Sequence, residues 1–358
     1  MNIKMIPAAL VPALMIALPA HAQNSSQGMG YGSYVAGEYR VFTGAGEPAS
    51  FDDVIAAMGR HRVVFIGETH DDPTGHMLEV ELLEGAYDAY GAPGSNRGAP
   101  RPIALSLESF QRDVQSILDE YLAGLITENA FRTDSRAWPR YETDYRPLIE
   151  FSKKNGLAVI AANAPRRYTN RVARNGRESL YDLSPEALAS LAPQPYGQAS
   201  EEYRNQWIQA ISEVMKEEGM KCGLPIPEPE QGDEPVHAPA PVGSHDNMGN
   251  QLHSQVLWDA TMAYWIADYL AQEEDALVLH LAGSFHVARG TGAPEHLEAY
   301  RPGTSRMIIV LRPVADIDTF EPAPEGEWGD FVIQTDESRT LEEIECREYL
   351  AKLGTTRP

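Results

Sequence analysis

The sequence predicts an α/β protein with a mostly parallel sheet flanked by helices. Its apolar runs have the length of strands, and most are continuous rather than alternating, which is typical of strands buried on both faces of a parallel sheet. Segments with helical periodicity lie between these runs, as the crossover connections of such a sheet require. The predicted strands lie within residues 63–66, 103–107, 157–161, 277–281 and 307–311.

The helix after the first strand has a clear start signal. Asp72 is a suitable N-cap, and Pro73 fits the first helical position because its missing N–H would be unpaired there. Leu78, Leu82 and Ala86 then share one apolar face. Further helices are predicted within residues 113–131, 184–192 and 250–272.

The remaining segments define the domain organisation. One domain is expected at 41–335, after a flexible lead at 23–40, and its long connections leave room for a small all-helical subdomain near 112–150 and 182–220. Residues 223–243 are rich in proline and acidic side chains, which predicts an extended insertion. A charged helical tail is expected at 336–358.

Residues 1–22 have the features of a cleaved signal peptide. Lys4 precedes an apolar stretch, and the residues 20–22 (AHA) form a small-x-small cleavage site. An uncleaved membrane anchor is the alternative, but the apolar stretch is shorter than the ~20 residues of a membrane span and contains two prolines. No cysteine lies near the cleavage point. We therefore expect a periplasmic, secreted protein that is not a lipoprotein and has no integral membrane span.

Charge and cysteine content limit the partners. The formal net charge is −23, so the chain repels the phosphates of nucleic acid and anionic lipid, and neither is expected as a partner. The two cysteines, Cys222 and Cys346, could form a disulfide in an oxidising compartment, but the sequence leaves their pairing open.

Polar and ionisable side chains follow four of the predicted strands at the point where each strand ends. The carboxyl ends of parallel strands meet at one edge of a sheet, where open α/β sheets bind ligands, so we expect these side chains to converge. They are Glu68 and His70 after the first strand, Glu108 after the second, Asn163, Arg166 and Arg167 after the third, and Ser284 and His286 after the fourth.

His76 and Asp259 extend this cluster. His70 and His76 lie beside the start of a helix, where the positive end of the helix dipole disfavours a protonated imidazole. We therefore expect neutral rings, which can bind a metal ion or accept a proton. Asp259, on the long helix, is expected to orient one histidine of the cluster.

Simpler explanations exist for several of these residues. Glu68 and His70 could merely cap the next helix. His280, in the middle of a predicted strand, is expected to be a core histidine. The arginine-rich segment 166–177 could be a solvated helix face, although an anionic group at the mouth of the site explains it better.

Five motifs together resemble the ChaN-like haem-binding uptake family, whose superfamily also contains erythromycin esterases and the TIKI and TraB proteins. In chain order, across residues 41–315, they are VVFIGETHDDPTGHMLEVELL, IALSLESFQRDVQSILDEYLAG, LAVIAANAPRRY, WDATMA and LAGSFHV. The resemblance implies a parallel sheet with a small helical subdomain, an envelope location and haem held between the protomers of a homodimer. It also implies a tyrosine as axial ligand, and haem-transport components of the envelope as partners.

Tyr168 is the candidate for that axial ligand. A phenolate can ligate ferric haem, and the adjacent Arg166 and Arg167 could hold the propionates. We also assign His76 and Asp259 to the haem-binding residues. Family members often carry two adjacent histidines where this chain has Gly75 and His76.

The wider superfamily implies a different function, a divalent-metal-dependent esterase or peptidase. Glu68, His70, Glu108 and His286 would then be catalytic, and Glu68, His70 and His286 would hold Mn, Zn or Co. Ser284 lies in no Gly-x-Ser-x-Gly motif, so a serine nucleophile is not expected. A structural envelope protein with a vestigial site is the third alternative.

Overall fold

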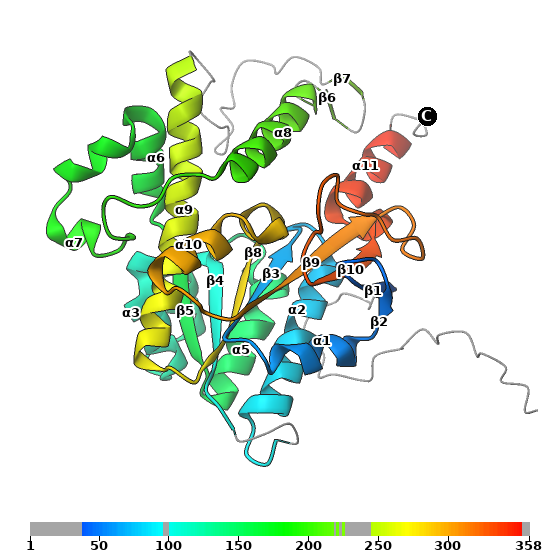
Figure 1. Ribbon diagram of the computed structural model, residues 1–358, viewed down its shortest axis with the longest axis horizontal. Coiled ribbons are helices and arrows are strands. Elements are labelled where there is room, and N and C mark those ends of the chain that lie inside the picture. Colours follow the sequence, from blue (N-terminus) through cyan, green and yellow to red (C-terminus); the bar gives the residue numbers. More distant parts are fainter. Residues whose placement is uncertain (1–37, 96–99, 218–219, 222–223, 226–244, 353–358) are drawn as a thin grey trace, which may run out of the picture. The chain divides into compact units, whose positions relative to one another are not determined.

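The computed structural model describes residues 38–95, 100–217, 220–221, 224–225 and 245–352 (Figure 1). The main sheet consists of β1 (Tyr39–Thr43), β2 (Pro48–Ala49), β3 (Val63–Glu68), β4 (Ile103–Gln111), β5 (Ala158–Asn163), β8 (Leu277–Gly283), β9 (Arg306–Val314) and β10 (Phe331–Asp336). Its strand order is β2-β1-β10-β9-β3-β8-β4-β5. The strands from β10 to β5 are parallel, whereas β1 and β2 are antiparallel to their neighbours. The predicted fold class is therefore confirmed.

Helices cover both faces of this sheet. The first face carries α1 (Phe51–Met58), α2 (Pro73–Ala86), α3 (Gln115–Leu122), α4 (Glu128–Asp134) and α5 (Arg146–Asn155), and the second carries α9 (His245–Gln272) and α10 (Ala293–Tyr300). Alternate residues of β3 divide between the two apolar layers, because side chains along a strand point to opposite faces. Val64 and Ile66 belong to the first layer, and Val63 and Phe65 to the second. The architecture is thus a three-layer α/β/α arrangement.

A third apolar cluster lies around the first half of α9. It includes residues of α6 (Arg166–Asn175) and α8 (Glu201–Glu217), and α7 (Pro185–Leu188) packs beside it (Figure 1). The two segments predicted to form one helical subdomain therefore contact different neighbours. The helices of 112–150 pack against the first face of the sheet, and those of 182–220 pack against α9.

Several boundaries differ from the sequence-based ones. β1 begins inside the lead expected at 23–40, and β10 takes up the start of the tail expected at 336–358, which continues as α11 (Leu341–Lys352). β6 (Met220–Lys221) and β7 (Leu224–Pro225) form a separate pair, so the insertion expected at 223–243 contains a short strand at its start. These strands escaped prediction because they are short or lie at the antiparallel edge, where no continuous apolar run is needed.

Several short helices lie between the longer elements of the described chain. They are the π-helices Tyr87–Gly91 and Tyr141–Tyr145 and the 3-10 helices Arg112–Val114, Arg177–Asp182, Ser284–His286, Ala288–Gly290 and Glu337–Arg339. Residues 1–22, most of the lead, most of the insertion and Cys222 lie outside the described residues, so the signal peptide stays a prediction and the pairing of Cys222 with Cys346 stays open. Among the residues that the structure describes, no helix combines the length and apolar character that crossing a membrane requires.

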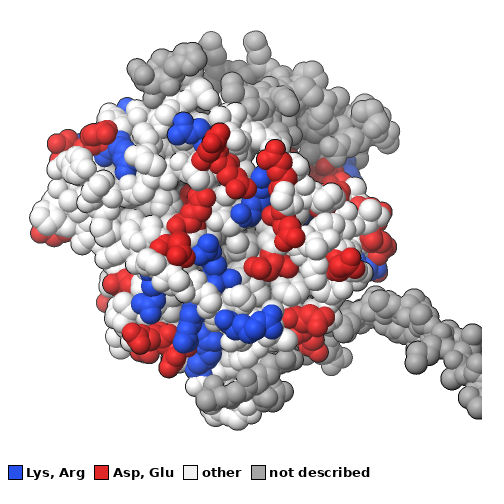
Figure 2. Space-filling model, in the orientation of Figure 1, with Lys and Arg blue, Asp and Glu red and all other residues white. Residues whose placement is uncertain are grey.

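Acidic and basic side chains are interspersed on the face drawn in Figure 2 rather than separated into one broad basic surface. Many of the described basic side chains contact a carboxylate. Arg289 contacts Glu202 at 3.0 Å, for example, and Arg306 contacts Glu298 at 3.0 Å. The distribution agrees with the excess of acidic residues in the sequence.

Candidate functional site at the carboxyl edge of the sheet

Glu68 closes β3 and is buried, with 4% of its surface exposed. Its Oε1 accepts two hydrogen bonds, one from the Tyr145 hydroxyl at 2.7 Å and one from His70 Nδ1 at 2.6 Å. The N-cap of α2 is Asp72, whose carboxylate accepts from the Thr74 N–H at 3.0 Å. Glu68 therefore does not cap the helix, and its contacts orient the imidazole of His70.

His70 reaches from this pair toward the end of β8. Its side chain is 45% exposed, and its ring meets Trp138 edge-on at 5.2 Å between centroids. A Cβ placed on Gly283 would lie 3.1 Å from His70 Nε2 and 3.7 Å from Glu108 Oε2. A side chain at Gly283 would therefore displace the imidazole by a few tenths of an ångström, so the imidazole and the second carboxylate both closely approach the backbone at the end of β8.

Glu108 and His286 form the other half of the site. The Gly283 N–H donates to Glu108 Oε2 at 2.8 Å, and Glu108 Oε1 lies 3.7 Å from His286 Nε2. On its other side His286 donates through Nδ1 to Asp259 Oδ1 at 2.7 Å, so His286 is the histidine that Asp259 orients. The Glu68–His70 pair and the Asp259–His286 pair thus face one another across Glu108. The ends of β3, β4 and β8 come together, as the sequence predicts.

The carboxylates raise the pKa of the histidines. Burial lowers the pKa of His286, but the charges of Asp259 and Glu108 outweigh it and raise the value to about 9. Burial also opposes the protonation of His70 and His76, yet contacts with Glu68 and Glu79 respectively raise both pKa values. These carboxylates therefore act against the neutral rings expected from the helix dipole, because adjacent full charges exceed the partial charge of a helix end.

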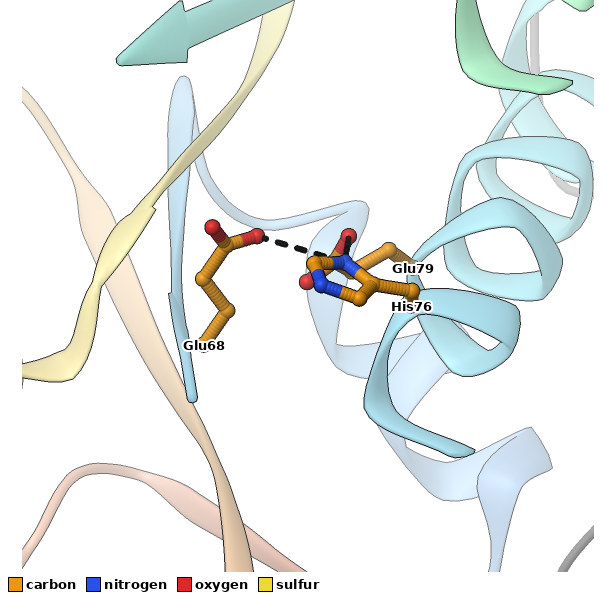
Figure 3. A group of neighbouring side chains, drawn as sticks. All are labelled: Glu68, His76 and Glu79. Atoms are coloured by element: carbon orange, nitrogen blue, oxygen red, sulfur yellow. Dashed lines mark hydrogen bonds and ion pairs between the residues drawn. The ribbon is translucent and has the colours of Figure 1, made fainter. Parts of the chain in front are cut away.

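Glu68 also belongs to a buried cluster with His76 and Glu79 (Figure 3). His76 Nδ1 is 3.1 Å from Glu79 Oε2 and 3.7 Å from Glu68 Oε2. His76 Nε2 is 3.0 Å from the backbone oxygen of His70 and 3.6 Å from Asp144 Oδ2. We call His76, Glu68, Glu79 and Asp144 the His76 cluster; all four residues are buried.

The sequence did not reveal Glu79, Asp144 or Tyr145 as site residues. Glu79 follows His76 at a spacing of i+3 on α2, a pattern that places two side chains on one helix face and could have identified the pair. Asp144 and Tyr145 lie in the π-helix Tyr141–Tyr145, far along the chain, and carry no local signal. A Cβ on Gly75, the residue before His76, would lie 2.9 Å from Asp72 Oδ2.

The predicted haem ligands begin α6, directly after β5. Arg167 pairs with Asp113, and its guanidinium lies 4.4 Å from the centroid of the Tyr168 ring. The backbone N–H of Arg166 donates to Gln111 Oε1 at 3.0 Å, and its side chain is exposed. Tyr168 is half-buried against the cluster around α9. Arg167 is thus already neutralised by a carboxylate, whereas Arg166 extends into solvent.

His280 has the core role that the sequence predicts. It is fully buried in β8, and its Nδ1 lies 2.9 Å from the Ser106 hydroxyl. Burial lowers the pKa of His280 to about 3. The ring is therefore neutral and structural.

An open α/β sheet with ionisable side chains gathered at the carboxyl ends of its strands is typical of ligand-binding proteins. Residues 54–297 match the family model described as "Haem-binding uptake, Tiki superfamily, ChaN". The match covers more than half of the chain, and the chain belongs to this family. The family's description supports a role in haem binding.

The chain is similar to several known proteins. A structure of cofacial haem binding to ChaN of Campylobacter jejuni has a TM-score of 0.56 and 17% identity, covering 82% of this chain and 96% of that one. A mutant erythromycin esterase in its open conformation has a TM-score of 0.38 and 12% identity, covering 83% of each chain. Protein RETICULATA-RELATED 5, chloroplastic, of Arabidopsis thaliana is 23% identical over 260 residues, which is 70% of this chain. The chain spans 31% of the length of that relative.

Proposed function

We propose that this chain is an exported haem-binding protein of haem or iron uptake, with haem held at the carboxyl edge of the sheet. The observation that carries the proposal is the match of residues 54–297 to a haem-binding uptake family. Export follows from the signal peptide predicted at 1–22, and a periplasmic location places the protein where incoming haem would be bound.

The geometry at the start of α6 fits a haem ligand. Tyr168 presents a half-buried phenol beside the guanidinium of Arg167, and a tyrosine phenolate is a known kind of ligand for ferric haem iron. Because Asp113 already pairs with Arg167, Arg166 is the better partner for a haem propionate. His76 and Asp259 are both buried and held by other side chains, so we assign them to support of the site rather than to iron ligation.

Titrating the mature protein with haemin tests the ligand. The wild type is expected to shift the Soret band at stoichiometric haemin, and Tyr168→Phe should abolish the tyrosinate form of the spectrum. Tyr181→Phe is the matched control, because Tyr181 is 62% exposed and should leave the spectrum unchanged. An unaltered spectrum in Tyr168→Phe, or its loss in Tyr181→Phe, would refute the assignment of Tyr168.

A homodimer follows from the same proposal. The Campylobacter relative is described as binding haem cofacially, so two haems face each other in that protein. We propose that two protomers of this chain bring their haems together in the same way, and that haem-transport components of the envelope receive them. Sedimentation velocity during the haemin titration is expected to show a monomer becoming a dimer. A mass that does not change with haemin would contradict a haem-linked dimer.

The facing carboxylate–imidazole pairs favour a hydrolase as the second candidate function. His70 donates through Nδ1 to Glu68, which leaves Nε2 to take a proton from water as a general base. His286, with a pKa of about 9, is protonated at neutral pH and could stabilise an oxyanion. Glu108 lies beside both rings. In the metal-dependent alternative His286 would instead be deprotonated, and Glu68, His70 and His286 would hold a divalent Mn, Zn or Co ion that activates the water.

A panel of esters and peptides, with and without Mn²⁺, Zn²⁺ or Co²⁺, tests this second function. As a hydrolase the protein should turn over faster as pH rises, because the raised pKa of His70 keeps the base protonated at lower pH. Glu108→Gln should reduce this turnover. Absence of turnover on every substrate, or turnover that survives Glu108→Gln undiminished, would count against catalysis at this edge.

A further inference from the structure

We propose that Glu68, His76 and Glu79 form a buried site for one divalent transition-metal ion. The site lies behind the open edge where Glu108 and His286 face His70, and it does not depend on haem binding. Its ligands come from the last residue of β3 and from one face of α2 (Figure 3). The ion would therefore join the central strand of the sheet to the helix that follows it.

The first argument is geometric. One ligand atom from each of the three residues can be chosen so that all lie within 4.8 Å of one another. Ligand atoms around a tetrahedral ion with bonds of about 2.0–2.2 Å are roughly 3.3–3.6 Å apart. His76 Nδ1 is 3.1 Å from Glu79 Oε2 and 3.7 Å from Glu68 Oε2, so the donors are already close to that spacing.

The second argument concerns carboxylate oxygens that lack hydrogen bonds. Glu68 uses Oε1 for Tyr145 and His70, and its Oε2 is buried with no hydrogen-bond donor among the described residues when Glu79 is ionised. Glu79 Oε1 is buried in the same condition. Both residues are more than nine-tenths buried, and an oxygen withdrawn from water without a partner is costly. An ion bound between them would satisfy these oxygens.

The third argument is the tautomer of His76. Its Nε2 is 3.0 Å from the backbone oxygen of His70, and a carbonyl can only accept, so Nε2 carries a proton. In a neutral ring Nδ1 then has a free lone pair, and that lone pair points between Glu68 and Glu79 (Figure 3). Metal-binding histidines are usually held in this way, with the second nitrogen donating to a carbonyl or carboxylate.

The charges of the His76 cluster match a divalent ion. With neutral imidazoles, Glu68, Glu79 and Asp144 supply three negative charges, and one guanidinium opposes them, Arg140 at 2.8 Å from Asp144. Two negative charges remain in a buried space. One imidazole with two carboxylates suits Zn²⁺, Mn²⁺, Co²⁺ or Fe²⁺ better than Ca²⁺ or Mg²⁺, which prefer all-oxygen ligands.

Protons are the competing occupants. Without an ion, His76 Nδ1 and the carboxylate oxygens beside it can form a hydrogen bond only if a second proton is on His76 or a proton is on Glu79. A metal ion displaces such protons when it binds. Calorimetry of the chelator-treated mature protein with Zn²⁺ and Mn²⁺, in buffers of different ionisation enthalpy, should therefore show one equivalent bound with release of protons.

Two variants locate the ion. Glu79→Gln should weaken Zn²⁺ binding by more than about a hundredfold, since removal of a ligand exceeds the loss caused by removing an outer partner. Glu108→Gln is the matched control, because it makes the same change to a buried carboxylate that lies beside His286 instead of His76. This variant should bind Zn²⁺ as tightly as the wild type. Circular dichroism establishes that both variants are folded.

X-ray absorption of the zinc-loaded wild type provides a measurement that needs no variant. The proposed site supplies one imidazole, whereas a site at the open edge would use both His70 and His286. One imidazole in the zinc shell would support the proposal even if Glu79→Gln failed to fold. Two imidazoles, loss of zinc in Glu108→Gln but not in Glu79→Gln, or a wild type that binds no ion would overturn it.

Discussion

Replacing Asp259 with asparagine should lower the free energy of unfolding by about 3–5 kcal/mol at neutral pH, because it leaves a buried positive charge without its partner. Asp259 is fully buried and accepts from His286 Nδ1 at 2.7 Å. Asparagine has the shape of aspartate and can still accept the hydrogen bond from His286. The loss of unfolding free energy therefore measures the effect of removing the negative charge of Asp259. Urea unfolding measures it, with Asp182→Asn, which removes an exposed partner of Arg171, as a control expected to cost less than about 1 kcal/mol.

The pH dependence of this loss identifies its cause. The pKa of His286 rises from 6.5 in the unfolded chain to about 9 in the folded protein, so the folded state binds the proton more tightly. That stabilisation, about 3 kcal/mol, is fully present below pH 6.5 and is lost as pH rises through about 9. The stability curves of wild type and Asp259→Asn should therefore converge at alkaline pH. A difference that stays constant up to pH 10 would show that His286 is not held as an imidazolium.

Glu68→Gln is expected to lower the free energy of unfolding by about 1–3 kcal/mol and to weaken ligand or metal binding. Burial raises the pKa of Glu68, but the hydrogen bond from His70 and the charge of His76 reverse this and lower it. A carboxyl with a lowered pKa stabilises the protein above its unfolded pKa, and the contribution disappears as pH falls. The penalty of Glu68→Gln should therefore shrink in acid, which thermal unfolding across pH can measure.

A double-mutant cycle tests whether Glu68 and Glu108 share a site. His70 contacts Glu68 directly, and both His70 and Glu108 approach Gly283, so the two substitutions should be coupled by more than about 0.5 kcal/mol. Simple addition of the two effects would mean that the carboxylates act separately. Glu68→Ser should cost at least as much as Glu68→Gln, because Asp72 rather than Glu68 caps α2.

The sequence predicts those parts of the molecule that depend on local patterns or on the topology of a parallel sheet. Continuous apolar runs identify β3, β4, β5, β8 and β9, since both faces of these strands are covered. Strand direction then places Glu68, Glu108 and His286 at one edge without any knowledge of their contacts. By contrast, β1 and β10 pair at or near the antiparallel edge, where burial is incomplete at the strand ends and the pattern is weak.

The protonation of the site could not be predicted because it depends on contacts between distant segments. The start of α2 suggests neutral histidines, but Asp144 approaches His76 from the π-helix, and Glu79 approaches it from the next turn of α2. Tyr145 reaches Glu68 from 77 residues away along the chain. Tyr168 lies in no motif that fixes its role, so its assignment depends on its neighbours Arg166 and Arg167.

The haem content of the protein recovered from the periplasm of cells supplied with haem tests the central proposal most directly. We expect a coloured protein, with its N-terminus near Gln23, that carries about one haem per chain by the pyridine haemochrome spectrum. Haem bound there in the wild type would support both export and haem binding. A colourless protein that also fails to take up added haemin would contradict the account.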